Sequence, residues 1–205
     1  LSGRAIGTTI GTNSTAEGDS TTASGDFGSH AEGLSTTASG DSSHAEGDST
    51  TASGDFGSHA EGLSTTASGY ASHAEGDSTT VNGNSSHAEG LSTTVNGNFG
   101  SHAEGLSTTA SGGLGSHAEG DHATVSGDSS HAEGSYTTAS GYASHAEGSH
   151  TTANVFASHA QGRYNKALAG DPSAYSATAD AMVIGNGANA TDGASNCFRI
   201  TFDGN

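Results

Sequence analysis

Histidine and glutamate recur two residues apart along most of this chain, inside a repeated five-residue unit, S-H-A-E-G. Neutral imidazole and carboxylate groups are good ligands for zinc and similar ions, and both can act as general acids or bases. An imidazole N–H group can also donate a hydrogen bond to a carboxylate. We use the name His–Glu ladder for the set His30, Glu32, His44, Glu46, His59, Glu61, His73, Glu75, His87, Glu89, His102, Glu104, His117, Glu119, His131, Glu133, His145, Glu147 and His159.

The repetition of the ladder argues for a structural role. A catalytic site needs one distinctive group of residues in a pocket, whereas here ten nearly identical units follow one another. We therefore predict no enzymatic activity, no catalytic residue, no metal site and no cofactor, and we expect histidine to donate hydrogen bonds to glutamate. Metal binding by the ladder is the alternative that the residue types leave open. Because no Lys or Arg lies between Ala5 and Gly162, histidine is the only partner for these glutamates, and we expect its pKa to be raised.

The spacing of the ladder predicts the elements that position it. Its histidines are 14 or 15 residues apart, with a second unit, T-T-A-S-G or T-T-V-N-G, between successive copies of the first. A fixed period this short predicts a solenoid in which each repeat forms one rung and stacks on its neighbours. Residues two apart on a strand point to the same side, so Ser29 shares a face with Ala31, and Thr21 with Ala23. That face carries only small residues, which indicates a narrow interior, and we expect the glycine closing each unit to form a corner.

The predicted fold is therefore all-β: a parallel β-roll solenoid of about eleven rungs of 14 or 15 residues, with no helix. Residues 1–14 read as an atypical first rung, and residues 15–162 as the regular array. Residues 163–205 contain the only proline and read as a C-terminal cap or neck. The first residue is Leu1 rather than Met, so we expect the chain to be a fragment or a processed product.

Composition taken alone points to disorder, because Leu, Ile, Val and Phe make up 22 of 205 residues and the net charge is −18. Ordered stacking explains why one strand face carries only small side chains while the other face carries His and Glu. A thin interior of Ala and Ser buries little apolar area, so we expect the chain to associate into an oligomer. The scarcity of basic residues excludes nucleic-acid binding through phosphate contacts, and no apolar run is long enough for membrane insertion.

Large apolar residues fall at the corners between units. They either contact a neighbouring chain or form an exposed row that meets a cell-surface receptor or glycan. The candidate surface contacts are Phe27, Phe56, Tyr70, Phe99, Tyr142 and Phe156.

The half-repeat S-x-A-x-G, together with A-I-G at Ala5–Gly7 and V-I-G at Val183–Gly185, resembles the head repeats of trimeric autotransporter adhesins, the YadA-like heads. The resemblance covers roughly residues 4–190 and implies a left-handed β-roll, a homotrimer and an extracellular location. Adhesin heads place Val and Ile toward the trimer axis at the positions where this chain has His and Glu, so a dry axis is not implied. We predict instead that the His–Glu ladder faces the axis, with His and Glu of different chains within hydrogen-bonding distance.

The combination of S-H-A-E-G with T-T-A-S-G is similar to repeats in tail and appendage proteins of phages and prophages. The segment Ser195–Asn205 is similar to one that precedes a self-cleaving chaperone domain in such proteins. We therefore predict a non-enzymatic, trimeric fibre segment of a phage tail appendage that takes part in host attachment on the virion. The alternatives are a bacterial cell-surface adhesin head, a pure spacer, and an ice-binding solenoid with a flat hydroxyl face formed by Thr22, Ser24, Thr37 and Ser39.

Overall fold

The computed structural model describes residues 10–188 and 193–204, and the chain divides into two compact units, residues 1–100 and 101–205. Both units are all-β, and the described residues contain no helix. The predicted first rung, residues 1–14, lies mostly outside the described residues.

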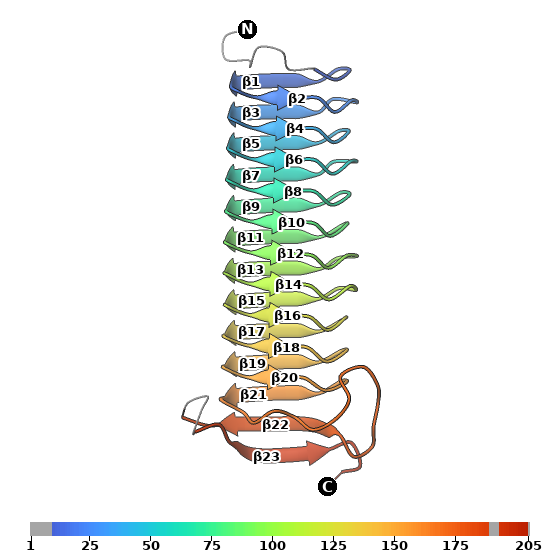
Figure 1. Cartoon of the computed structure of the whole chain (residues 1–205), viewed down its shortest axis with the longest axis vertical. Helices are drawn as coiled ribbons and strands as arrows, with labels where there is room; N and C mark the ends of the chain where they lie inside the picture. The colour runs from blue at the N-terminus through green and yellow to red at the C-terminus, as the bar shows by residue number, and fades with distance from the viewer. Residues whose placement is uncertain (1–9, 189–192, 205) are drawn as a thin grey trace. The chain divides into compact units, whose positions relative to one another are not determined.

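The first unit is a parallel β-solenoid with two sheets (Figure 1). One sheet contains the long strands formed by the S-H-A-E-G segments and by the equivalent first segment. Their order is β1 (Thr15–Asp19), β3 (His30–Leu34), β5 (His44–Asp48), β7 (His59–Leu63), β9 (His73–Asp77) and β11 (His87–Leu91). The other contains short strands from the T-T-A-S-G and T-T-V-N-G segments, in the order β2 (Thr22–Ala23), β4 (Thr37–Ala38), β6 (Thr51–Ala52), β8 (Thr66–Ala67), β10 (Thr80–Val81) and β12 (Thr94–Val95).

The second unit repeats this architecture and adds two C-terminal strands (Figure 1). Its long strands are β13 (His102–Leu106), β15 (His117–Asp121), β17 (His131–Ser135), β19 (His145–Ser149) and β21 (His159–Arg163), followed by β22 (Asp180–Asn186) and β23 (Asn196–Thr201). Its short strands are β14 (Thr109–Ala110), β16 (Thr124–Val125), β18 (Thr138–Ala139) and β20 (Thr152–Ala153).

Neighbouring repeats pair in parallel and in register. In β5 and β7, for example, Ala45 lies opposite Ala60 and Gly47 opposite Gly62, so equivalent residues of successive repeats stack directly on one another. Each turn therefore takes 14 or 15 residues. With six turns in the first unit and five in the second, the predicted solenoid of about eleven rungs is confirmed.

The interior of each unit consists of small side chains from both sheets. Ala31 on a long strand and Ala38 on a short strand are fully buried, and so is the residue two positions before Ala38, Thr36. Ser43 is also buried, and its hydroxyl donates a hydrogen bond of 2.6 Å to the carbonyl oxygen of Gly40, which ties the corner to the following strand. The narrow interior predicted from the alternation of small residues is confirmed.

The corners differ in detail from the prediction. Gly33 has a φ of 116°, but it lies inside strand β3, and a Cβ atom there would come within 2.0 Å of the carbonyl oxygen of Gly47 in the next rung. The residue that turns the chain is Ser35, with a φ of 56°, two positions further on. The glycine is therefore required for close stacking of rungs, while other residues, often serine, adopt the left-handed corner conformation.

In β22, near the end of the second unit, apolar side chains replace the polar side chains of the regular repeat. Strand β22 pairs in parallel with β21, and its Val183 is fully buried in the place that alanine fills elsewhere. Met182 lies opposite His159, and Ile184 lies opposite Gln161, so apolar side chains follow the ladder positions here. Strand β23 then pairs antiparallel with β22.

A buried carboxylate holds this C-terminal region together. Asp180 is 2% exposed, and its Oδ2 accepts a hydrogen bond of 2.7 Å from the backbone N–H of Ala169. Its Oδ1 pairs with the guanidinium of Arg199 on β23, so the negative charge is both paired and hydrogen-bonded.

No described helix could cross a membrane.

Candidate functional site

The His–Glu ladder lies on the outer face of the long strands in both units. On β5, His44 and Glu46 are partly exposed, while Ala45 between them is fully buried, as period-2 alternation requires. In-register pairing places His44 opposite His59 and Glu46 opposite Glu61. Within each unit, the same pairing produces one column of histidines beside one column of glutamates.

The imidazole rings of the ladder stack on one another. In the first unit, the ring centroids of His44 and His59 are 4.7 Å apart and their planes differ by 3°. In the second unit, those of His117 and His131 are 4.6 Å apart and parallel. The separation follows from the spacing of neighbouring strands, which is about 4.8 Å. The rings therefore shield one another from water along the column.

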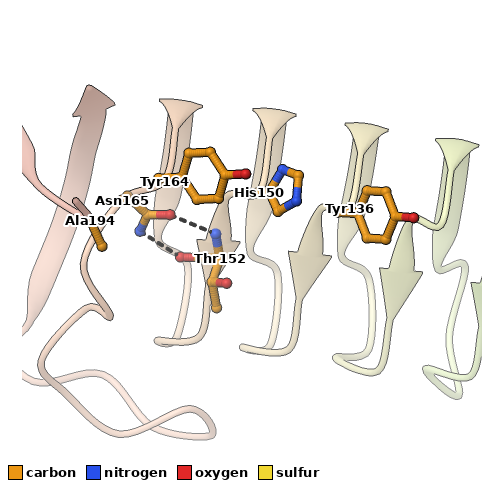
Figure 2. Close-up of a pocket in the computed structure, with 6 residues that line it drawn as sticks. All are labelled: Tyr136, His150, Thr152, Tyr164, Asn165 and Ala194. Atoms are coloured by element: carbon orange, nitrogen blue, oxygen red, sulfur yellow. Dashed lines mark hydrogen bonds between the residues drawn. The ribbon is translucent and has the colours of Figure 1, made fainter. Parts of the chain in front are cut away.

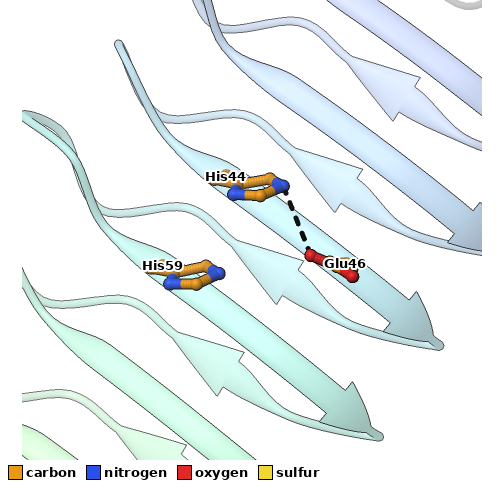
Figure 3. A group of neighbouring side chains, drawn as sticks. All are labelled: His44, Glu46 and His59. Atoms are coloured by element: carbon orange, nitrogen blue, oxygen red, sulfur yellow. Dashed lines mark ion pairs between the residues drawn. The ribbon is translucent and has the colours of Figure 1, made fainter.

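At the rungs of His44 and His59, histidine and glutamate of the same chain do not form the hydrogen bond that we expected. The Nε2 atom of His44 is 3.9 Å from Oε2 of Glu46 (Figure 3), and the same distance separates these atoms in His59 and Glu61. This separation is too long for a hydrogen bond. The Nε2 atoms that are buried and have no hydrogen-bond partner in the described chain include those of His44, His59, His73, His117, His131, His145 and His159.

The expected rise in histidine pKa is wrong for the three ladder residues whose pKa departs clearly from the ordinary value. Burial lowers the pKa of His59 and His131, and repulsion from the stacked histidines on either side lowers it further, more than the nearby glutamates raise it. Burial and His145 likewise lower the pKa of His159. These rings are therefore held in the neutral form, which has one nitrogen free to accept a hydrogen bond or a metal ion.

The ladder also brings metal-ligand atoms together. One ligand atom each from His44, Glu46 and His59 lies within 4.8 Å of the other two (Figure 3). The group formed by His117, Glu119 and His131 has the same arrangement in the second unit. Neutral imidazole and carboxylate are the donor set that divalent transition metals prefer.

The candidate surface contacts lie at the corner that precedes the long strands. Phe27, Phe56 and Phe99 are 74%, 65% and 68% exposed, and each has a φ near 60°. Tyr70 stacks on Phe56 with ring centroids 4.9 Å apart. The three phenylalanines are thus both solvent-exposed and in a backbone conformation that bulky residues rarely adopt.

In the second unit, Tyr142 and Phe156 occupy the same corner and form a stacked pair at 5.5 Å. Tyr142 is exposed, whereas Phe156 is half-buried. Of the six candidates, the structure therefore brings four together as two pairs, and leaves Phe27 and Phe99 outside them.

A second aromatic column lies at the opposite corner, and our sequence analysis missed it. His122, Tyr136, His150 and Tyr164 follow one another at intervals of 14 residues, and successive ring centroids are 4.6, 4.9 and 4.3 Å apart. All four have a φ between 46° and 56°. The constant interval was visible in the sequence, but the two residue types hid it from a search for identical letters.

This column borders a hollow of about 240 Å³ in the second unit, lined by Tyr136, His150, Thr152, Tyr164, Asn165 and Ala194 (Figure 2). The Asn165 side chain accepts a hydrogen bond of 2.7 Å from the Thr152 N–H and donates one of 3.0 Å to the Thr152 carbonyl. An asparagine side chain thereby replaces the next short strand and satisfies the edge of β20. The hollow consequently lies where the regular repeat ends.

Comparison with known proteins agrees with this architecture. The YadA head domain repeat matches residues 10–27, 31–56, 60–86, 118–144 and 132–154, which together span more than half of the chain. No curated protein matches the sequence. The matched segments are built from the rungs of the parallel β-solenoid, and the chain belongs to the family of YadA head domain repeats.

Proposed function

We propose that the chain is a non-enzymatic attachment segment that works as a homotrimer, with its S-H-A-E-G sheets turned toward the trimer axis. The observation that carries this proposal is the set of buried Nε2 atoms, such as those of His59 and His73, that have no partner in their own chain. A carboxylate from a neighbouring chain would accept a hydrogen bond from the Nε2–H group of such a histidine. Glutamates in the column have no Lys or Arg beside them, so a histidine from another chain is also their natural donor.

Light scattering coupled to size-exclusion chromatography tests the trimer. We expect a mass about three times the 19.8 kDa of the chain. His59→Asp would add three carboxylates around the axis in one rung, and repulsion should weaken the trimer. Thr66→Asp, on the outward face of the short strand in the same rung, is the matched control and should leave the mass unchanged. A monomeric parent protein would refute the proposal.

The exposed phenylalanines favour receptor binding over a pure spacer. A bulky residue at φ near 60° costs about 1–3 kcal/mol, and burial of the ring does not repay that cost at Phe27, Phe56 or Phe99. Ser42 and Ser85 fill the same corner in other rungs with φ values of 58° and 52°. Phenylalanine is therefore not required for the fold at this position, and we propose that it contacts a cell-surface receptor or glycan.

The triple substitution Phe27→Ser, Phe56→Ser and Phe99→Ser separates these roles, because serine already occupies this corner in neighbouring rungs. We expect unchanged circular dichroism and molecular mass, with loss of binding to host cells and on a glycan array. A triple variant that binds as the parent does would exclude these residues as the contact surface.

The particle that carries the chain is a separate part of the proposal. The S-H-A-E-G variant and the segment Ser195–Asn205 resemble phage and prophage appendage proteins, so we place the chain on a phage tail appendage rather than on a bacterial surface. Antibody labelling in electron microscopy distinguishes the two. Label on intact bacteria, with none on purified phage particles, would favour the bacterial adhesin head.

A further inference from the structure

We propose that the His–Glu ladder binds divalent transition-metal ions, each held by Nε2 atoms of histidines from two neighbouring rungs and by the glutamate carboxylate between them. In the first unit, His44, Glu46 and His59 form such a group, and so do His59, Glu61 and His73. All three ligand atoms of each group lie within 4.8 Å of one another, and Figure 3 shows the group of His44, Glu46 and His59. This inference uses the geometry of one chain and does not depend on the proposed trimer.

The unpartnered nitrogens of the ladder suit metal binding. A neutral imidazole has one ring nitrogen whose lone pair can bind a metal ion. The Nε2 atoms of His44, His59 and His73 are buried without a partner in the chain, so an ion would replace no hydrogen bond there. Binding would also remove the desolvation cost of leaving these nitrogens unsatisfied.

The charge of the site favours a cation as well. The nearest acidic groups are glutamates stacked at one strand spacing, and no basic residue occurs between Ala5 and Gly162 to neutralise them. Nitrogen and oxygen donors together select zinc, copper, nickel or cobalt, whereas calcium and magnesium prefer ligand sets made only of oxygen. We therefore infer zinc-like ions as the ligand class.

Side chains have to rotate to close the site. Nε2 of His44 and Oε2 of Glu46 are 3.9 Å apart, and tetrahedral zinc with bonds of about 2.1 Å holds two ligand atoms roughly 3.4 Å apart. The Glu46 side chain is 49% exposed, so it is free to rotate inward by that amount. The His59 ring stands parallel to that of His44 and has to tilt for both lone pairs to converge on one ion. Water completes the coordination.

The shared histidine limits how many ions bind. His59 belongs to two groups, so occupation of one group takes a ligand from the next. With two histidines per ion, the ten ladder histidines hold no more than five ions per chain.

The experiment uses the full chain, freed of metal with EDTA and then titrated with zinc chloride at about pH 7.5, where histidine is neutral. We expect saturable binding in isothermal titration calorimetry, no more than five zinc ions per chain by elemental analysis after dialysis, and a rise in melting temperature that EDTA reverses. Cobalt(II) should give the visible absorption of a four-coordinate nitrogen–oxygen site.

Matched variants locate the ions. A ladder variant in which every second histidine is replaced by Gln leaves no two ladder histidines in neighbouring rungs and should lose bound zinc; the replaced residues are His44, His73, His102, His131 and His159. Glu61→Gln should weaken binding at its own group while preserving side-chain size. The double variant His122→Gln and His150→Gln alters the two histidines outside the ladder and should bind as much zinc as the parent. Absence of saturable zinc binding, or equal binding by the ladder variant and the parent, would overturn the inference. The mass measured in EDTA reports on the trimer alone, so the two proposals can fail separately.

Discussion

The buried threonines of the T-T-A-S-G units give a prediction that the structure makes sharply. Thr65 is fully buried, and its Oγ1 atom has no hydrogen-bond partner in the described chain. Valine has the same shape with a methyl group in place of the hydroxyl, and Val81 and Val95 already occupy the interior. We predict that Thr65→Val stabilises the fold.

The magnitude follows from what the hydroxyl loses on folding. A buried polar group without a hydrogen bond costs about 1–3 kcal/mol relative to water. The added methyl group contributes further apolar burial, and slight crowding in the narrow interior opposes it. We therefore expect a gain of about 1 kcal/mol in the free energy of unfolding. Thr36 and Thr79 lie three rungs apart, roughly 14 Å, so Thr36→Val and Thr79→Val should be additive.

Equilibrium urea unfolding followed by circular dichroism measures the effect, with all variants at one protein concentration because association shifts apparent stability. Thr151→Val is the matched control, since Thr151 is equally buried but its Oγ1 donates a hydrogen bond of 3.1 Å to the carbonyl of Glu147. That variant should be neutral or destabilised. If Thr65→Val loses as much stability as Thr151→Val, the hydroxyl of Thr65 has a partner and the reasoning is refuted.

Two further predictions concern the corners and the ladder. Gly47→Ala should destabilise the fold by about 3 kcal/mol or more in urea unfolding, because its Cβ would lie 2.1 Å from the carbonyl oxygen of Gly62 at a φ of 118°. Gly57→Ala, which meets nothing within 4 Å at a φ of 85°, should cost only about 1–2 kcal/mol, and equal losses would contradict the stacking argument. Since burial lowers the pKa of His59, His131 and His159, the unfolded chain takes up protons first as the pH falls, so stability should decline below about pH 6.5 and stay level above it. A melting temperature in EDTA that is the same at pH 5 and pH 8 would contradict this.

The fold could be predicted because repetition removes most of the ambiguity of a short strand. A single S-H-A-E-G unit could lie in many structures, but successive copies can stack in register only if Ser29 and Ala31 always face the same side. Ser29 and Ala31 are both buried, which confirms that they lie on the inner face of the strand. The interior position could hold only small residues, and the sequence shows this directly.

The corners could not be predicted to the residue because the relevant property is backbone conformation rather than residue type. The left-handed position is filled by Ser35 in one rung, Phe56 in another and Tyr136 in a third. Glycine, the residue that normally signals this conformation, fills the corner in some rungs, as at Gly115 with a φ of 52°. Other glycines, such as Gly33, stand inside a strand because the next rung leaves no room for a Cβ atom.

The pKa of the ladder histidines was predicted wrongly because the sequence shows neighbours along the strand more readily than neighbours across it. Glu61 is two residues from His59 and was the expected influence. Burial has the largest effect on His59, and the stacked rings of His44 and His73 come next, ahead of Glu61. For the pKa of His59, histidines 14 or 15 residues away in the sequence therefore have a larger effect than the glutamate two residues away.

The same stacking explains how a chain with a net charge of −18 and few large apolar residues folds. Each rung places Ala on Ala and donates backbone hydrogen bonds to the next, as from the His44 N–H to the Ser58 carbonyl at 2.9 Å, so order is gained rung by rung. In-register stacking also places equivalent charged residues directly above one another, so the glutamates form a column of like charges that repel one another. The repeat supplies a column of histidines beside them instead of Lys or Arg, and burial lowers the pKa of three of these histidines, His59, His131 and His159. Unpartnered Nε2 atoms such as those of His44 and His59 can be satisfied only from outside the chain, by a carboxylate that accepts a hydrogen bond from the N–H or by a cation that binds the lone pair. This need links the proposed trimer to the proposed metal ions.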